Sequence, residues 1–305
     1  NPVGVPAPAG ASQFGAFLDS IQDLDWDGIG DVLVGTHSEE GAAFSNAGAV
    51  FVLSGADGSQ IRKLVSPNPI DYGFFTFPAA IDDIDGDTYQ DILVGAHGEE
   101  RVYLFSGKTG SLLMTVDAPE SGKEFGQTVE VMPDMNGDDV SDYLVGAPAS
   151  STGSARVYLI SGADGSTTGP LLTVASPNPS PDSGSGMMTH MFGVRLCHLP
   201  DSNGDMVDDF AVSAPYEDGL TYADVGAVYI FSGADGSLIS SSEGDEHAGY
   251  FGLSIVSLDD YDDDSRPDLF VGAPGEVGYE NSGAGYLVDP LTGLRSSIHL
   301  VDEYF

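Results

Sequence analysis

One pattern, Asp-x-[Asp/Asn]-x-Asp-x-x-x-Asp, occurs five times along this chain of 305 residues, and it limits the fold more than any other feature. The copies recur at intervals of about 60 residues. They begin at Asp23, Asp83, Asp134, Asp201 and Asp260. Self-similarity at such a period is the signature of a repeat protein, in which each copy is one supersecondary unit that buries its apolar surface against its neighbours.

Each copy lies inside a longer unit, which the first repeat illustrates. Phe14-Gly15 precedes the aspartate-rich segment, and an apolar run at residues 32–35 follows it. An alternating run at 50–55, an Asp-Gly pair at Asp57-Gly58 and a last apolar run at 61–65 complete the unit. Phe-Gly recurs at 125–126, 192–193 and 251–252, and loosely around Tyr72-Gly73-Phe74. The unit therefore predicts four short strands.

These units predict an all-β fold. No stretch shows sustained 3.6-residue apolar periodicity, and Asp-Gly between alternating runs predicts a hairpin whose two turn residues both have positive φ. Four antiparallel strands repeated at this period are typical of a β-propeller blade, so we expect a single five-bladed domain over residues 1–305. The expected repeats span approximately 14–71, 72–124, 125–191, 192–250 and 251–305. The last residues, 303–305, resemble residues 249–251, which leaves open a longer array.

A Gly-Ala-Pro triplet, or a variant of it, follows each aspartate-rich segment. The full triplet stands at 146–148 and 272–274, and partial matches stand at 213–215, 95–97 and 35–37. Together with Phe-Gly and the aspartate pattern, it resembles the FG-GAP repeat of integrin α-subunit propellers, as in a prokaryotic-type integrin-like protein. Integrin α propellers have seven such repeats, of which only some bind calcium, whereas this chain has five. The resemblance implies an adhesion or ligand-recognition module.

The aspartate-rich segments are predicted calcium loops. Calcium takes about six to eight hard oxygen ligands, and carboxylates at alternating positions 1, 3 and 5 of a loop can surround one ion. Position 7 typically supplies a backbone carbonyl, and position 9 supplies a last carboxylate. We therefore expect about five Ca²⁺ per chain, one per repeat. The predicted ligands are Asp23, Asp25, Asp27, Ile29, Asp31, Asp83, Asp85, Asp87, Tyr89, Asp91, Asp134, Asn136, Asp138, Val140, Asp142, Asp201, Asn203, Asp205, Val207, Asp209, Asp260, Asp262, Asp264, Arg266 and Asp268.

The alternative is that these segments are Asx-turns that bind no metal. Five copies in register argue against it, because several carboxylates within a few ångströms repel one another unless a cation is present. Bound metal should therefore contribute to folding itself. Position 6 often requires positive φ, which favours glycine, yet only Gly28 meets this requirement. The other loops have Thr88, Asp139, Met206 and Ser265 at this position.

Acidic residues dominate the composition, since 48 Asp and Glu face 9 Lys and Arg and the formal net charge is −39. Nucleic acid and anionic membrane surfaces are therefore not expected as partners, because both need a basic protein surface. Five calcium ions would leave most of this charge, which we interpret as adaptation to a saline medium. No apolar run is long enough for membrane insertion, and no signal peptide is visible at Asn1. Cys197, the only cysteine, is expected in the core.

The order of the strands within a unit indicates which loops can recognise a ligand. In an antiparallel unit, the calcium loop and the Asp-Gly turn lie at one end, and the other loops lie at the opposite end. Those other loops are longer and more varied, and binding residues are common in such loops. Ordinary solvated connections are the alternative interpretation. The candidate ligand-binding residues are Phe44, Tyr216, Tyr222, Tyr279 and Asn281.

The sequence shows no pattern that predicts catalysis. The six histidines have no His-x-x-x-His spacing, and no group of cysteines supports a zinc site. His37 and His97 stand at the Pro position of the Gly-Ala-Pro variants, so the repeat accounts for them. We therefore expect a module that is not an enzyme, is secreted or displayed at the cell surface, binds an extracellular protein or glycan, and is monomeric when isolated. A lectin-like carbohydrate-binding propeller and the non-catalytic scaffold domain of a larger secreted enzyme are the alternatives.

Overall fold

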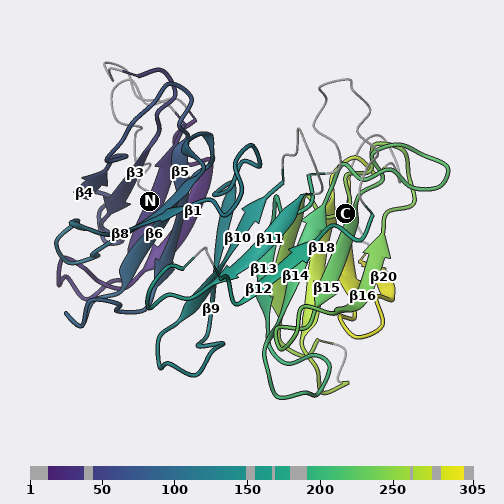
Figure 1. Ribbon diagram of the computed structural model, residues 1–305. Helices are drawn as coiled ribbons and strands as arrows, with labels where there is room; N and C mark the ends of the chain where they lie inside the picture. The colour runs from purple at the N-terminus through teal and green to yellow at the C-terminus, as the bar shows by residue number, and fades with distance from the viewer. Residues whose placement is uncertain are drawn as a thin grey trace, which may run out of the picture. The chain divides into compact units, whose positions relative to one another are not determined.

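The computed structural model describes residues 13–37, 44–148, 155–166, 169–178, 191–261, 264–276 and 283–298. These residues form five antiparallel sheets of four strands each (Figure 1). Within each sheet, neighbouring strands are also neighbours in the sequence. The all-β class and the four-stranded antiparallel unit are therefore confirmed, and the presence of five such sheets agrees with the predicted five-bladed propeller.

The strand bounds follow the five repeats. The first sheet contains β1 (Phe17–Ile21), β2 (Asp31–Thr36), β3 (Ala49–Leu53) and β4 (Gln60–Leu64). The second contains β5 (Phe75–Ile81), β6 (Asp91–Ala96), β7 (Arg101–Phe105) and β8 (Leu112–Asp117). The third contains β9 (Thr128–Met132), β10 (Asp142–Ala147), β11 (Arg156–Ile160) and β12 (Leu172–Ala175). The fourth contains β13 (Leu196–Leu199), β14 (Asp209–Ala214), β15 (Ala227–Phe231) and β16 (Leu238–Glu243). The fifth contains β17 (Ser254–Leu258), β18 (Asp268–Ala273), β19 (Ala284–Val288) and β20 (Arg295–Ile298).

The middle strands of a sheet are more buried than its last strand, and their sequences explain why. Strand β3 reads AVFVL and β6 reads DILVGA, and every residue of both strands is buried. Such continuous apolar runs suit strands that are covered on both faces. The outer strand β8 reads LLMTVD, and only Val116 of it is fully buried. An outer strand therefore needs apolar residues on one face only.

The chain divides into two compact units, Asn1–Ala147 with Tyr158–Leu171, and Pro148–Val157 with Leu172–Phe305. Each unit has its own buried clusters of apolar side chains. A short 3₁₀ turn, η1 (His97–Glu99), is the one helical element among the described residues. Nothing in that part of the chain is a helix of the length and apolarity that crossing a bilayer requires.

The cores lie between successive sheets of a unit. In the first unit, Val52 of β3 belongs to the same buried cluster as Val94 and Tyr103 of the second sheet. In the second unit, Val228 of the fourth sheet and several residues of the fifth form another such cluster. Cys197 lies in this cluster and is buried, as the sequence predicted. Face-to-face packing of consecutive sheets is thus how each repeat buries its apolar residues.

The phenylalanine of the Phe-Gly pair occupies the same place in each sheet, where its ring contacts an aromatic ring of the third strand. Phe125, Phe192 and Phe251 make this contact with ring centroids 5.8, 5.8 and 5.5 Å apart. In the second sheet, Phe75 makes it with Tyr103 at 5.8 Å, so the expected match around Phe74 is one residue early. The glycine of the pair allows a close approach of two backbone segments. A Cβ on Gly126 would lie only 2.4 Å from the Arg101 carbonyl oxygen.

The Asp-Gly hairpins differ from the predicted two-residue turn. The N–H of Ser54 donates to the Ser59 carbonyl at 2.8 Å, and the N–H of Gly58 donates to the Ser54 carbonyl at 2.8 Å. Of the Asp-Gly pair, only Gly58 has positive φ (74°), whereas a two-residue type I′ turn requires it at both residues. The prediction for Asp57 was therefore wrong. The longer turn is accompanied by a bulge between β3 and β4, which absorbs the extra residue.

Candidate metal centre

The five aspartate-rich segments, called aspartate loops below, are residues 23–31, 83–91, 134–142, 201–209 and 260–268. Each one joins the first strand of a sheet to the second strand. The ninth residue of the loop is also the first residue of the second strand, and it is buried in every sheet. These residues are Asp31, Asp91, Asp142, Asp209 and Asp268, with exposed fractions of 1, 0, 0, 0 and 3%.

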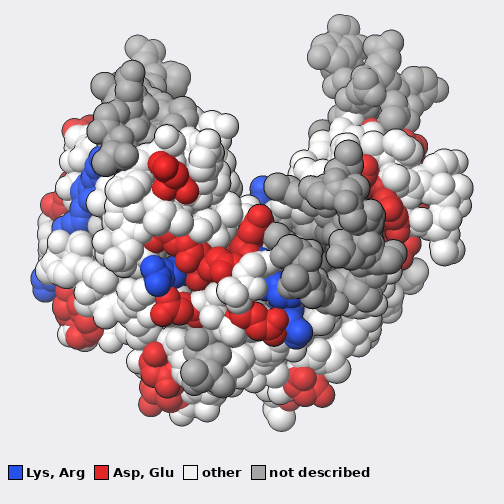
Figure 2. Space-filling view, turned by 45° about the horizontal axis from the view of Figure 1, so that its top comes forward, with Lys and Arg blue, Asp and Glu red and all other residues white. Residues whose placement is uncertain are grey.

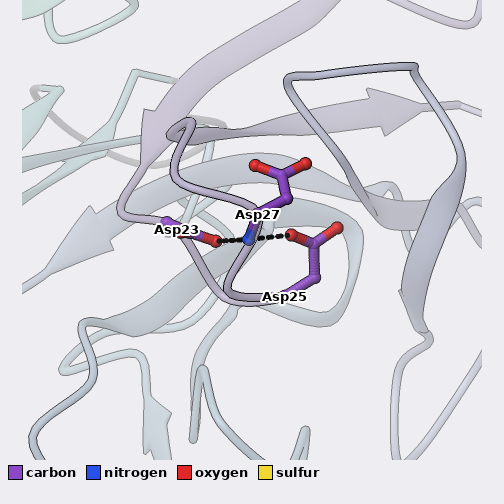
Figure 3. A group of neighbouring side chains, drawn as sticks. All are labelled: Asp23, Asp25 and Asp27. Atoms are coloured by element: carbon purple, nitrogen blue, oxygen red, sulfur yellow. Dashed lines mark hydrogen bonds between the residues drawn. The ribbon is translucent and has the colours of Figure 1, made fainter.

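The first aspartate of a loop organises the backbone that follows it. Asp23 Oδ1 accepts hydrogen bonds from the N–H groups of Trp26 (2.6 Å) and Asp27 (3.2 Å), and its Oδ2 accepts one from Gly28 (2.7 Å). Figure 3 shows the Asp23 carboxylate and the Asp25 carboxylate converging on the Asp27 N–H. The same pattern recurs at Asp83, Asp134 and Asp201. The loops therefore share one backbone conformation.

The buried ninth aspartate ties the loop to the hairpin between the third and fourth strands. Asp31 Oδ2 accepts from the Leu24 N–H at 2.7 Å, and its Oδ1 accepts from the Gly55 N–H at 3.1 Å. Ser54 Oγ donates to Asp27 Oδ2 at 3.1 Å. The corresponding glycine donors are Gly107, Gly162 and Gly233. This link was not predicted from the sequence, although Ser-Gly directly after the third strand in four repeats was the available signal.

Carboxylate oxygens gather at single points in two of the loops. One oxygen each from Asp23, Asp25 and Asp27 lies within 4.8 Å of the other two. The same limit holds for Asp83, Asp85 and Asp91. Several hard oxygen atoms around one point are the donor set that calcium prefers, so the side chains present fit a calcium ion. The third and fourth loops have a neutral amide oxygen at position 3 (Asn136 and Asn203), so one of their predicted ligands is uncharged.

In the second, third and fourth loops, the pKa of the first carboxyl is lowered and that of the ninth is raised. Burial raises the pKa of Asp91 to about 6, although the Ile84 and Gly107 N–H groups act in the opposite direction. Burial raises the pKa of Asp142 and Asp209 in the same way. At Asp83, desolvation is outweighed by backbone N–H donors, so its pKa is lowered. In the second, third and fourth loops, the first carboxylate is thus stably ionised, whereas the buried ninth carboxylate lacks sufficient compensation for its charge.

In the first four loops, φ is positive at two positions, 4 and 6. At position 6, φ is 91° for Gly28, 78° for Thr88 and 69° for Met206, as the loop pattern predicted. Asp139 and Ser265 have φ of 64° and 73°. Position 4 was not predicted: φ there is 67° at Trp26, whereas three other loops have glycine at this position. These glycines are Gly86, Gly137 and Gly204.

Comparison with known proteins identifies the repeat. The FG-GAP repeat family matches residues 251–288. Integrin alpha-4 of Xenopus laevis is 32% identical over 200 residues, which cover 60% of this chain and 18% of that protein. Integrin alpha-5 of Xenopus laevis is 27% identical over 269 residues, which cover 81% and 24%. The chain carries FG-GAP repeats of the integrin α type. It spans 18–24% of the length of these two relatives.

Solved structures support the fold of these FG-GAP repeats. The crystal structure of BBS1N in complex with ARL6DN, soaked with lead, matches this chain with a TM-score of 0.51 and 11% identity. The match covers 92% of this chain and 68% of that one. The same complex soaked with mercury matches with a TM-score of 0.51 and 12% identity. At such low identity, the likeness concerns the fold alone.

The position-7 residues of the FG-GAP loops were predicted to supply carbonyl ligands, and this stays a prediction. Their N–H groups donate to the position-5 carboxylate, as from Ile29 to Asp27 at 2.8 Å and from Arg266 to Asp264 at 2.9 Å. The equivalent donors are Tyr89, Val140 and Val207. Asp262 lies outside the described residues.

Three of the predicted ligand-binding residues are described by the structure, and they lie in loops at the opposite strand ends from the aspartate loops. Phe44 precedes β3 and is exposed by 39%, and Tyr222 precedes β15 and is exposed by 50%. Tyr216 is half-buried, with its ring centroid 5.3 Å from that of Tyr250. Tyr279 and Asn281 lie outside the described residues. Among the predicted residues that the structure describes, Phe44 and Tyr222 are therefore the two exposed aromatic side chains, one in each compact unit.

A carboxylate near the end of the second strand fixes these recognition loops in three sheets. Tyr103 Oη donates to Glu99 Oε2 at 2.5 Å, and Ser66 Oγ donates to the same oxygen at 2.9 Å. Tyr229 and Tyr286 make the same contact with Glu217 and Glu276. Both of those glutamates are buried. The start of the loop is thereby held against the third strand of its own sheet. Less conformational entropy is then lost when the loop binds a partner.

Proposed function

We propose that this chain is a calcium-dependent recognition module that works outside the cell and mediates adhesion or ligand capture without catalysis. The observation that carries the proposal is the convergence of three carboxylate oxygens in each of the first two aspartate loops, together with the buried ninth aspartate that all five loops share. About five ions would bind, one per loop. Extracellular calcium, at about millimolar concentration, is sufficient to fill even weak sites of this kind.

The side chains of each loop divide the work of holding an ion. Asp23 is held in place by three backbone N–H groups, so it is available in one fixed orientation. Asp31 presents a buried carboxylate whose desolvation a cation would offset. Bound calcium supplies the positive charge that relieves repulsion among these groups, and so it links metal binding to the stability of the whole sheet.

The metal part of the proposal is tested by stoichiometry and stability together. Calcium titration by calorimetry should give about five ions per chain, and a chelator should lower the melting temperature. Asp85→Ala should remove one ion. Asp259→Ala, which removes the same charge at an exposed position just outside the fifth loop, should leave the stoichiometry unchanged. The proposal would be contradicted if the chain bound no calcium, or if the chelator left its melting temperature unchanged.

The recognition part is tested separately at the opposite strand ends. Binding of extracellular matrix proteins and of an array of glycans should be measured with and without calcium. We expect a ligand that requires calcium and that binds less well to Tyr222→Ala, since that aromatic ring is exposed on a loop that Glu217 fixes. A glycan ligand would favour the lectin-like function over adhesion to proteins. A chain that binds neither class would refute the recognition role while leaving the metal sites intact.

A further inference from the structure

Trp26 is an unusual residue for its position in the first aspartate loop. Its side chain is 79% exposed, and its φ of 67° lies in the left-handed region that bulky residues avoid. Gly86, Gly137 and Gly204 occupy this position in the next three loops. Neither burial nor backbone preference therefore explains the presence of tryptophan here, and an exposed indole suggests a binding role.

The indole lies beside a second aromatic ring that already holds a cation. The centroids of Trp26 and Tyr89 are 5.9 Å apart, and their planes meet at 71°. Lys108 Nζ lies 4.8 Å from the centre of the Tyr89 ring and donates to the Asp87 carbonyl oxygen at 3.3 Å. The chain itself thus places an ammonium group on the Tyr89 ring of this pair, while most of the Trp26 ring is left open to a partner.

The charge around the pair selects the kind of partner. Asp25 and Asp27 flank Trp26 in the sequence and are exposed, and one Ca²⁺ would not neutralise the four carboxylates of this loop. A second copy of this chain is a poor partner, because it has only 9 Lys and Arg against 48 Asp and Glu. A sugar ring could stack on the indole, but it would gain nothing from the surrounding negative charge.

We propose that Trp26, supported from below by the buried Tyr89, is a docking surface for a lysine- or arginine-rich segment of a partner protein, at the end of the first unit that carries the aspartate loops. A basic side chain would stack on the open face of the indole, and the neighbouring carboxylates would attract its charge. This surface is additional to the proposed recognition loops, which lie at the opposite ends of the strands.

The test uses Trp26 as its own probe, since it is the only tryptophan of the chain. A synthetic peptide of alternating lysine and glycine is added to the calcium-loaded protein, and tryptophan emission is followed. We expect saturable quenching or a spectral shift that weakens as salt is added. By calorimetry, Trp26→Gly should bind the peptide about fivefold more weakly. Both Trp26→Gly and the matched control Met206→Gly remove an exposed side chain from a left-handed position of an aspartate loop, and the control should bind normally.

The outcomes decide between specific docking and general attraction. Glycine suits both altered positions, so melting curves should show that both variants remain folded. If Trp26→Gly binds the peptide as tightly as the unaltered chain does, the attraction is general and the proposal is overturned. If neutral oligosaccharides change the Trp26 emission and the basic peptide does not, the occupant is a glycan and the proposal is again overturned. The test remains interpretable even if Trp26→Gly also loses its calcium ion. The metal-free loop carries more negative charge than the calcium-loaded loop, so the loss of calcium would not by itself weaken the binding of a basic peptide.

Discussion

Single residues in this chain carry strain that only the whole loop explains. Thr88 has φ of 78° at an exposed loop position, where a β-branched side chain is unfavourable. The N–H of Thr88 nevertheless donates to Asp83 Oδ2 at 2.6 Å, and that bond requires this backbone conformation. Local propensity is thus overruled by the requirement to direct the backbone N–H groups at the first carboxylate.

A pair of substitutions in the second loop tests this strain. Thr88→Gly should stabilise the calcium-loaded chain by about 1 kcal/mol, because it removes the left-handed penalty of a side chain. Gly86→Ala should destabilise it by a similar amount, because φ is 80° there. A clash would not contribute, since no atom lies within 4 Å of the added Cβ. Urea unfolding at fixed calcium concentration measures both. Equal stabilities would show that backbone strain is not stored in this loop.

His97 makes stability depend on pH through burial. Its Nδ1 is buried without a hydrogen-bond partner, its ring stacks on Phe74 with centroids 4.7 Å apart, and burial with help from the nearby His37 lowers its pKa to about 4. Because the folded pKa is below the unfolded value of 6.5, this stability is complete above pH 6.5 and is lost as the pH falls toward 4. His97→Phe keeps an aromatic ring but cannot take up a proton. Over this pH window, its free energy of unfolding, measured in urea, should fall by up to about 3 kcal/mol less than that of the unaltered chain. Parallel losses would contradict a buried neutral histidine.

At the scale of the elements, the aspartate loop and the hairpin of the same sheet act as one unit. A Cβ on Gly55 would lie 1.9 Å from the Gly30 carbonyl oxygen, and the Gly55 N–H is a donor to Asp31. Gly55→Ala should therefore destabilise the chain by roughly 3 kcal/mol and weaken calcium binding in the first loop. Gly169→Ala, at a glycine with open space around it, is the matched control and should be nearly neutral. Thermal melting and calcium titration report the two effects, and a normal first site in Gly55→Ala would disprove the coupling.

The same elements show what sequence can and cannot predict. The strands and loops were predictable because the same residue pattern recurs in every repeat. Buried apolar runs such as β6 and the acidic positions keep the same spacing each time. The link from Gly55 to Asp31 was not, because it joins residues 24 apart and depends on how β2 and β3 pair. The length of the turn at Asp57-Gly58 was mispredicted for a related reason, since the bulge beside it follows from strand pairing and not from the dipeptide.

For the whole molecule, the decisive quantity is charge. The formal net charge of −39 acts against any compact state, and Asp and Glu form several patches on the face drawn in Figure 2, where Lys and Arg are few. Part of this repulsion is diffuse and responds to ionic strength, with a screening length of about 8 Å at physiological salt. The other part is concentrated in the aspartate loops, where a mobile ion cloud cannot enter a buried carboxylate site such as that of Asp91.

These two parts should separate in a stability measurement on the metal-free chain. Raising NaCl should increase the melting temperature gradually, because diffuse repulsion is screened. Millimolar CaCl₂ at the same ionic strength should raise it further and in a saturable way, because the proposed sites exist in the folded loops and not in the unfolded chain. MgCl₂ should act much more weakly, since Mg²⁺ demands a small octahedral shell and gives up its water reluctantly. If NaCl at matched ionic strength recovered the full effect of calcium, the acidic loops would be screened rather than occupied.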